Sequence, residues 1–126
     1  MKKNMKINNK LIQKNINLLW ENMNTGSTIS GYNEMNGGTT ISLSSSDYDL
    51  LLVVFVPNVT AGNASDSCIC IKGKDIRLIS ADTSSTVSVR NLTYSSDMQY
   101  VAGSGIQGGS VQERRNVPIK IYGIKL

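Results

Sequence analysis

The sequence contains no histidine and few of the other residues that commonly build catalytic or metal sites. Its 126 residues include two cysteines, one tryptophan, one phenylalanine and two prolines. Without histidine, the Ser-His-Asp and Cys-His arrangements are excluded, as is any general acid or base built on imidazole. Two cysteines are also too few ligands for a zinc site within one chain. We therefore predict a protein that is not an enzyme and that holds no metal and no cofactor.

Long hydrophobic runs are also missing. The run Leu50–Val56 covers seven residues and stops at Pro57, whereas a helix that spans a bilayer needs roughly 20. A secretory signal needs an apolar stretch of roughly 7–15 residues, and Asn and Lys interrupt the apolar residues between Ile7 and Asn17. We expect no signal peptide, no membrane partner and synthesis in a reducing cytoplasm.

The two cysteines, Cys68 and Cys70, are separated only by Ile69. In an extended strand they point to the same face, but neighbours at this spacing lie near or beyond the roughly 7 Å limit between Cα atoms for a disulfide. We predict two small packing residues without a bond between them.

The net charge of +4 belongs to the first residues of the chain. Residues 1–16 hold five lysines and no acid, while the remaining 8 basic and 9 acidic residues sum to −1. Residues 1–15 are therefore predicted to be a basic arm, either a solvated tail or a tether that settles on an acidic surface of a partner. Nucleic acid is not the expected partner, because the arm lacks arginine and aromatic residues. The anchoring candidates are Lys2, Lys3, Lys6, Lys10 and Lys14.

Residues 16–126 show the pattern of an all-β domain. Short alternating runs are separated by turns rich in Gly, Ser, Thr, Asn and Asp, which favours a two-layer antiparallel β-sandwich of jelly-roll type. Residues 116–126 alternate up to the last residue, and we expect this strand to pair with residues 15–22, which carry Trp20. The only helix considered is a short one between Lys6 and Asn15.

Three internal segments have more specific expectations. Leu50–Val56 is apolar at every position, so we expect a central strand buried on both faces. Ser67–Lys72 and Ile76–Ser80 are separated by a short glycine-containing turn, which predicts a β-hairpin. Gly103–Ser110 is rich in glycine and is interpreted as a mobile surface loop.

Two groups of residues could form a site. Asp47 and Asp49 could act as the carboxylate pair of a small glycan-acting enzyme, although side chains on one turn more commonly cap backbone amides. Aromatic and polar groups near loops could bind a sugar, the other interpretation being that the tyrosines complete the core. The candidates for such a surface are Tyr94, Tyr100, Arg114 and Arg115.

Three segments carry a further signal when read together. They are residues 17–22 (Asn-Leu-Leu-Trp-Glu-Asn), residues 43–51 (Leu-Ser-Ser-Ser-Asp-Tyr-Asp-Leu-Leu) and residues 118–125 (Pro-Ile-Lys-Ile-Tyr-Gly-Ile-Lys). Together they resemble a small β-domain of phage and prophage structural proteins of Gram-positive bacteria. The resemblance covers roughly residues 16–126 and offers no catalytic motif to carry over. It implies a domain at the tip of a tail fibre or minor tail protein, or one that projects from the virion, in contact with other virion proteins or the host surface.

A fibre needs a long shaft, and only about 15 residues precede the domain in this sequence. We therefore expect a non-enzymatic decoration or accessory protein on the virion exterior, on the capsid in the manner of a head fibre, docked through its basic arm. The alternative is a tail-fibre or baseplate tip that binds a host cell-surface glycan. A homo-oligomer, most simply a trimer, is expected because such proteins match the symmetry of their platform.

Overall fold

The computed structural model describes residues 15–62, 64–81 and 86–126, and these form two antiparallel β-sheets packed face to face. Every regular element among them is a strand. The strands are β1 (Ile16–Glu21), β2 (Thr40–Ser42), β3 (Leu50–Asn58), β4 (Asp66–Ile71), β5 (Ile76–Ala81), β6 (Val87–Ser96), β7 (Gln99–Ala102), β8 (Ile106–Gln107), β9 (Ser110–Val111) and β10 (Arg115–Ile124). The predicted all-β sandwich is confirmed. Most of the predicted arm, with its five lysines and the short helix, lies outside the described residues.

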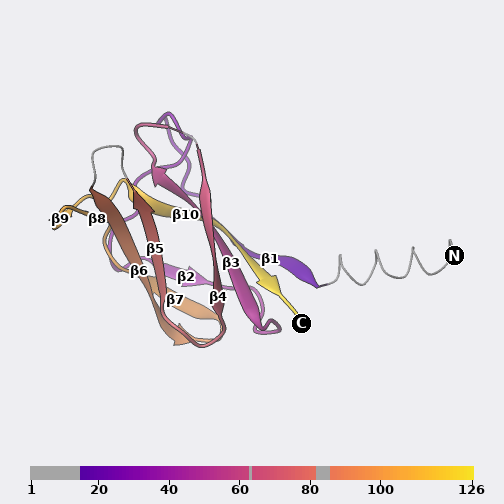
Figure 1. The fold of residues 1–126 in the computed structure, drawn as a ribbon. Helices are drawn as coiled ribbons and strands as arrows, with labels where there is room; N and C mark the ends of the chain where they lie inside the picture. Colours follow the sequence, from indigo (N-terminus) through magenta and orange to yellow (C-terminus); the bar gives the residue numbers. More distant parts are fainter. Residues whose placement is uncertain (1–14, 63, 82–85) are drawn as a thin grey trace, which may run out of the picture.

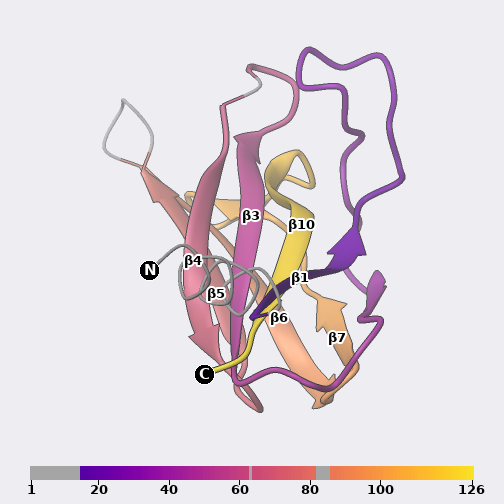
Figure 2. The ribbon, with the colours of Figure 1, turned by 90° about the vertical axis from the view of Figure 1, so that its right-hand side faces the viewer.

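The first sheet has the strand order β1-β10-β3-β4. Figure 2 looks onto this sheet, with β5, β6 and β7 of the second sheet behind it. In the second sheet the strands follow the order β2-β7-β6, β5 pairs with the other edge of β6, and the short β8 and β9 extend from the start of β6. The two layers are seen obliquely in Figure 1.

The closing strand pairs with the tryptophan strand, as the sequence predicts. Ile124 lies opposite Ile16, and Tyr122 lies opposite Leu18. The same strand pairs on its other side with β3, where Ile124 meets Leu50. β10 is therefore an interior strand, so the last residues of the sequence are held by hydrogen bonds from both sides.

The core lies between the sheets and follows from the alternation of side chains along each strand. In β3, Leu51, Val53 and Phe55 point inward and are buried. In β5, Ile76 and Leu78 are buried while Arg77 between them is exposed. Since successive residues of a strand point to opposite faces, this pattern fixes which face of each sheet meets the other.

The prediction of a hairpin across residues 67–80 is wrong. β4 pairs with β3 in the first sheet, whereas β5 pairs with β6 in the second. The turn at Gly73 therefore carries the chain from one layer to the other. A positive φ of 79° at this glycine allows the sharp change of direction.

Part of the glycine-rich stretch is ordered as a small hairpin. β8 and β9 pair through Gln107 and Ser110, and the two glycines between them have positive φ angles of 57° and 81°. A tight two-residue hairpin turn of this type requires two consecutive residues with positive φ. The interpretation of the whole stretch as a mobile loop is therefore wrong for residues 106–110.

A buried arginine connects the second sheet to four other parts of the chain. Arg90, on β6, is completely buried, and its guanidinium donates hydrogen bonds of 2.7–3.1 Å to backbone carbonyls. Its Nη1 atom also lies 3.9 Å from the Glu113 carboxylate. Burial lowers the pKa of Arg90 to about 10, so the group is still charged at neutral pH. The carbonyls belong to Met35, Gly103, Glu113, Arg115 and Asn116.

Asn116 makes the second polar link between the sheets. This buried residue has a φ of 47°, a conformation that asparagine tolerates better than most residues. Its amide nitrogen donates to the carbonyls of Leu78 and Ser88, and its oxygen accepts a hydrogen bond of 2.6 Å from Ser80. The start of β10 is thereby joined to both β5 and β6.

We expect Arg90→Lys to lower the free energy of unfolding by about 3–5 kcal/mol, because one ammonium cannot satisfy five buried carbonyls. The matched control is Arg77→Lys on neighbouring β5, which is exposed and makes one side-chain hydrogen bond, to Asn91; its effect should stay within about 0.5 kcal/mol. Urea unfolding followed by circular dichroism measures both. Equal losses in the two variants would contradict the role given to Arg90.

Gly123 lies on the closing strand, β10, and is buried against the core. A Cβ atom there would lie 2.6 Å from Leu19 Cδ1 and 3.0 Å from Tyr48 Cβ, so Gly123→Ala should lower the free energy of unfolding by about 1–3 kcal/mol. A Cβ atom at Gly62 would meet nothing within 4 Å, which makes Gly62→Ala the control. The same unfolding assay applies, and an unaffected Gly123→Ala variant would show that the core is looser than described.

Candidate functional site

The predicted tyrosine pair is part of the second sheet and its core. Tyr94 and Tyr100 lie opposite each other on β6 and β7, with ring centroids 5.8 Å apart in an edge-to-face arrangement. Tyr100 is completely buried, and its hydroxyl donates to the carbonyl of Lys74. Tyr94 is half-buried, and its hydroxyl donates to Asp97. The interpretation of Tyr100 as a surface residue is therefore wrong, because β7 lies between two strands and turns its ring inward.

The predicted arginine pair lies at the other end of β6. Arg114 is half-buried and donates to Gln112, while Arg115 is almost buried and donates to Gln107. Gln107 lies opposite Ser88, six residues before Tyr94, which corresponds to about 20 Å along a strand. The structure therefore does not bring the arginines and tyrosines into one site, and sugar binding by Tyr94 or by Arg114 stays a prediction.

The candidate carboxylate pair holds the end of the chain. Asp47 forms an ion pair of 3.0 Å with Lys125, and Asp49 accepts a hydrogen bond of 2.7 Å from the backbone N–H of Leu126. These contacts place the two side chains beside β10 rather than across a cleft, where a glycosidase would need them. The arrangement supports a structural role for this turn.

Cys68 and Cys70 are free thiols on the inner side of β4, with their sulfur atoms 3.2 Å apart. They lie opposite the buried Val53 and Leu51, which fits the predicted packing role. A hydrogen bond from Cys70 lowers the pKa of the Cys68 thiol to about 7. Among the residues that the structure describes, no group of three or more His, Cys, Asp or Glu side chains could hold a metal ion.

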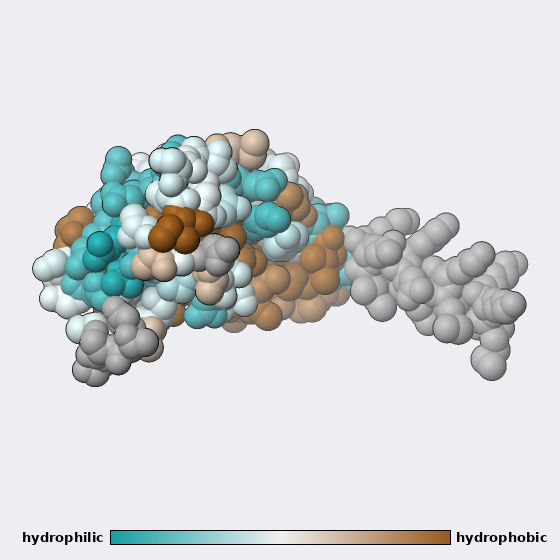
Figure 3. Space-filling view, turned by 90° about the horizontal axis from the view of Figure 1, so that it is seen from above, coloured by the Kyte–Doolittle hydropathy of each residue, from teal (hydrophilic) through white to brown (hydrophobic). Residues whose placement is uncertain are grey.

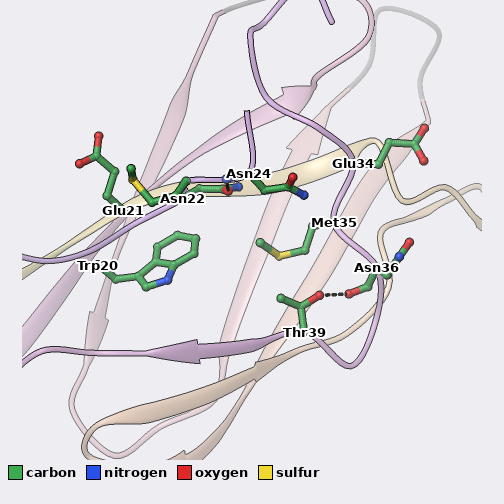
Figure 4. A pocket seen from close by; sticks show the side chains of 9 residues that line it. Trp20, Glu21, Asn22, Asn24, Glu34, Met35, Asn36 and Thr39 are labelled. Atoms are coloured by element: carbon green, nitrogen blue, oxygen red, sulfur yellow. Dashed lines mark hydrogen bonds between the residues drawn. The ribbon is translucent and has the colours of Figure 1, made fainter. Parts of the chain in front are cut away.

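A pocket opens where β1 ends and the loop before β2 passes it (Figure 4). Its volume is about 360 Å³, and Trp20 and Met35 face each other across it, with Thr39 beside them. Asn22 on its wall is buried and already bonded to the carbonyl of Pro118 and the N–H of Asn24. The carboxylates of Glu21 and Glu34 point away from the centre. The pocket offers an apolar wall and amide groups, which suits binding more than proton transfer.

The outside of the first sheet carries an exposed apolar surface. In the space-filling view, apolar side chains gather on the side of the molecule formed by the first sheet (Figure 3). Ile69 and Ile71 on β4 are 65% and 64% exposed. We call this surface the outer apolar face; its members are Ile16, Leu18, Leu50, Leu52, Val54, Ile69, Ile71, Tyr122 and Ile124.

Strand register arranges the outer apolar face in two complete rows. One row crosses all four strands through residues 16, 124, 50 and 71, and the next through residues 18, 122, 52 and 69. Because paired residues of antiparallel strands point to the same face, the side chains of each row lie side by side. The face is thus continuous, and contiguous apolar surfaces of this kind mark interaction sites.

Sequence reasoning did not identify this surface. Leu50–Val56 was expected to be covered on both faces because every residue in it is apolar, yet only Leu51, Val53, Phe55 and the last residue, Val56, are buried. The half-exposed Leu52 and Val54 lie on the other face. The sequence did contain a signal of this surface, because the strand is more apolar than a two-layer sandwich requires.

Comparison with known proteins gives no match: no protein-family model, no curated protein and no solved structure matches this chain. Over residues 15–62, 64–81 and 86–126, no helix is long and apolar enough to cross a membrane.

The buried tyrosines give the folded protein a predictable response to alkali. Burial raises the pKa of Tyr48 from its ordinary value of 10.0 to about 12 and raises that of Tyr100 as well. The unfolded chain then ionises first, so the contribution of these tyrosines to the free energy of unfolding should be constant below about pH 10 and fall as pH rises from there towards 12. Urea unfolding across this range measures the loss.

Tyr48→Phe is the control variant for the alkaline response. It removes one of the ionising groups, so the loss of stability above about pH 10 should become shallower, even though the variant also lacks the 2.6 Å hydrogen bond from Tyr48 to the carbonyl of Asp97. An identical pH profile in the two proteins would contradict the raised pKa.

Proposed function

We propose that this protein is a non-enzymatic structural component of a phage particle, a small decoration or accessory protein on the virion exterior. Its place on the particle is the capsid, and its attachment runs through residues 1–15. After synthesis in the cytoplasm of the bacterial host it joins other virion proteins and forms a homo-oligomer. The resemblance of residues 17–22, 43–51 and 118–125 to phage structural domains motivates the assignment to a virion.

The observation that supports an assembly role most directly is the outer apolar face. A continuous apolar surface across four strands is comparable to the largest apolar patch of a typical monomer, and such patches are often binding sites. By contrast, the polar groups considered for catalysis are engaged within the fold: Asp47 and Asp49 bind residues 125 and 126, and Arg90 binds backbone carbonyls. A protein built in this way is better suited to contact other proteins than to transform a substrate.

The distribution of charge supports attachment through the first residues. Residues 1–16 carry +5, and the rest of the chain carries −1. A short basic segment of this kind is attracted to an acidic surface over roughly a Debye length, about 8–10 Å at physiological salt. The nearly neutral body then has no strong attraction or repulsion of its own toward the particle.

One observation favours a second function, a receptor-binding tip of a tail fibre or baseplate. The pocket beside Trp20 has an aromatic wall and amide groups from Asn24 and Asn36, which are groups that bind sugars. A tip of this kind would bind host cells or cell-wall glycan, and its Trp20 fluorescence would change on binding. A decoration protein would instead bind purified capsids at high copy number.

Deleting residues 1–15 tests the attachment. We expect the truncated protein to lose at least about nine-tenths of its binding to purified particles, and binding of the full chain to weaken as salt rises from roughly 0.05 to 0.5 M. Cosedimentation with purified particles measures the bound fraction. Electron microscopy of labelled particles then locates the protein on the head or the tail.

The matched variant keeps the length of the arm and replaces Lys2, Lys3, Lys6, Lys10 and Lys14 with glutamine. It should bind as poorly as the truncated protein, because the attraction is electrostatic, whereas replacing Lys74 and Lys120 of the folded body should have little effect. Undiminished binding after truncation would contradict attachment through the arm.

A further inference from the structure

We propose that the outer apolar face is the surface through which two copies of this chain pack, sheet on sheet, about a two-fold axis. The inference rests on the proposed function in one respect, since it names the partner of the surface that supports an assembly role. Binding to the particle and binding between copies are nevertheless separate events, and each can be measured without the other.

The outer side of the second sheet is mixed in composition. Arg77 lies beside Asn91, and Thr93 lies beside Val101, which in turn lies beside Thr40. An apolar row through residues 79, 89, 106 and 111 adjoins these positions, so polar and apolar residues share this face, as is common for a sheet face in water. On the first sheet, two successive rows contain apolar residues alone, so that face has the composition of a covered one.

Strand β3 provides the strongest single argument for a covering layer. Its sequence is apolar at every position from Leu50 to Val56, as in strands that are buried on both faces. Within one copy the inner face and Val56 are covered, whereas Leu50, Leu52 and Val54 stay half-exposed. A second layer on the outside would give this strand the environment that its sequence matches.

The shape of the face favours a second sheet as the covering layer. Five of its nine members are isoleucine or valine, and such side chains pack well against one another when two sheets stack about 10 Å apart. Another copy of this chain is certain to present a flat surface with the same pattern of side chains. In a two-fold pair the same patch covers itself, so that one contact buries the face on both copies.

The charges at the border of the face are compatible with self-association. In the third row Glu21 lies opposite Lys120 across β1 and β10, followed by Val54 and Ser67. One acid beside one base leaves this border neutral, so two copies do not repel each other. A neutral face also lacks the cluster of basic residues that would direct it to an anionic lipid surface.

The size of the face fits the centre of an ordinary interface. Strands lie about 4.8 Å apart and side chains on one face repeat every ~6.7 Å, so nine positions cover roughly 300 Å² of flat area. The accessible area of protruding side chains is larger than this. A standard interface buries about 800 Å² per partner, with an apolar centre and a polar rim. Residues such as Glu21, Lys120 and Ser67 would supply part of that rim.

A pair fits the flat face better than the trimer expected from the resemblance. Around a three-fold axis, each flat face would meet two neighbours at an angle and would be covered only in part. Around a two-fold axis, the whole face meets one partner. The structure thus supports two copies, whereas the symmetry of a virion platform suggests three.

The mass of the full-length protein in solution tests this pairing. Sedimentation velocity between about 1 and 100 μM should give twice the 13.7 kDa of one chain. Ile69→Lys places a charge at the β4 end of an apolar row, and we expect the dissociation constant to rise at least about tenfold. The side chain is 65% exposed in the single copy, so the variant should fold, which circular dichroism checks.

The matched control is Ile79→Lys. Ile79 also lies on an edge strand and is 52% exposed, but on the outer side of the second sheet. This variant should sediment as the unchanged protein does. A milder substitution, Ile69→Thr, keeps the β-branched shape and should weaken the pair in the same direction, which provides a second measurement if the lysine variant folds poorly.

Several results would overturn the pairing. They are a monomer throughout the concentration range, a trimer, or a dimer equally stable with Ile69→Lys and with Ile79→Lys. A monomer that binds phosphatidylcholine vesicles, with or without anionic lipid, and loses this binding with Ile69→Lys would assign the face to a membrane instead. Dimers that fail to bind particles would contradict only the proposed function, and monomers that bind particles would contradict only the pairing.

Discussion

The fold depends on one buried cation. Arg90 reaches from the middle of the second sheet to the loop before β2, the end of β7, the segment after β9 and the start of β10. A guanidinium taken out of water is tolerated only when its donors are satisfied, so these segments must all be in place together. Hydrogen bonds from this one side chain thereby fix the long connections of this small domain.

The two sheets differ in what their outer faces can do. The second sheet has polar and apolar residues mixed on its outer face, and the buried polar links made by Arg90 of β6 and by Asn116 of β10 lie against its inner side. The first sheet is apolar on both sides, and its inner face meets the core. The buried polar links thus lie between the sheets, away from the outer apolar face. A contact on the first sheet can therefore form without disturbing the hydrogen bonds that hold the layers together.

Local pattern predicts some of these features and not others. Alternation in residues 116–126 and 15–22 is enough to predict two strands. Their pairing is expected because each strand needs a neighbour to form hydrogen bonds with. The turn at Gly73 is ambiguous, because a short turn can join strands of one sheet or of two. Burial of Tyr100 depends on β7 lying between β2 and β6, a neighbourhood set by distant segments. For the same reason the exposed side of β3 could not be predicted, since coverage depends on the whole strand order.

The interior position of β10 has a consequence for synthesis. Its two neighbours, β1 and β3, lie more than 50 residues earlier in the chain and touch each other only through it. As the polypeptide emerges from the ribosome, the first sheet cannot close until residues 115–124 have followed. Folding of this domain is therefore a late event, dominated by contacts between residues far apart in sequence. A nascent chain interrupted before those residues would present unpaired strand edges, which makes it a ready substrate for chaperones and proteases.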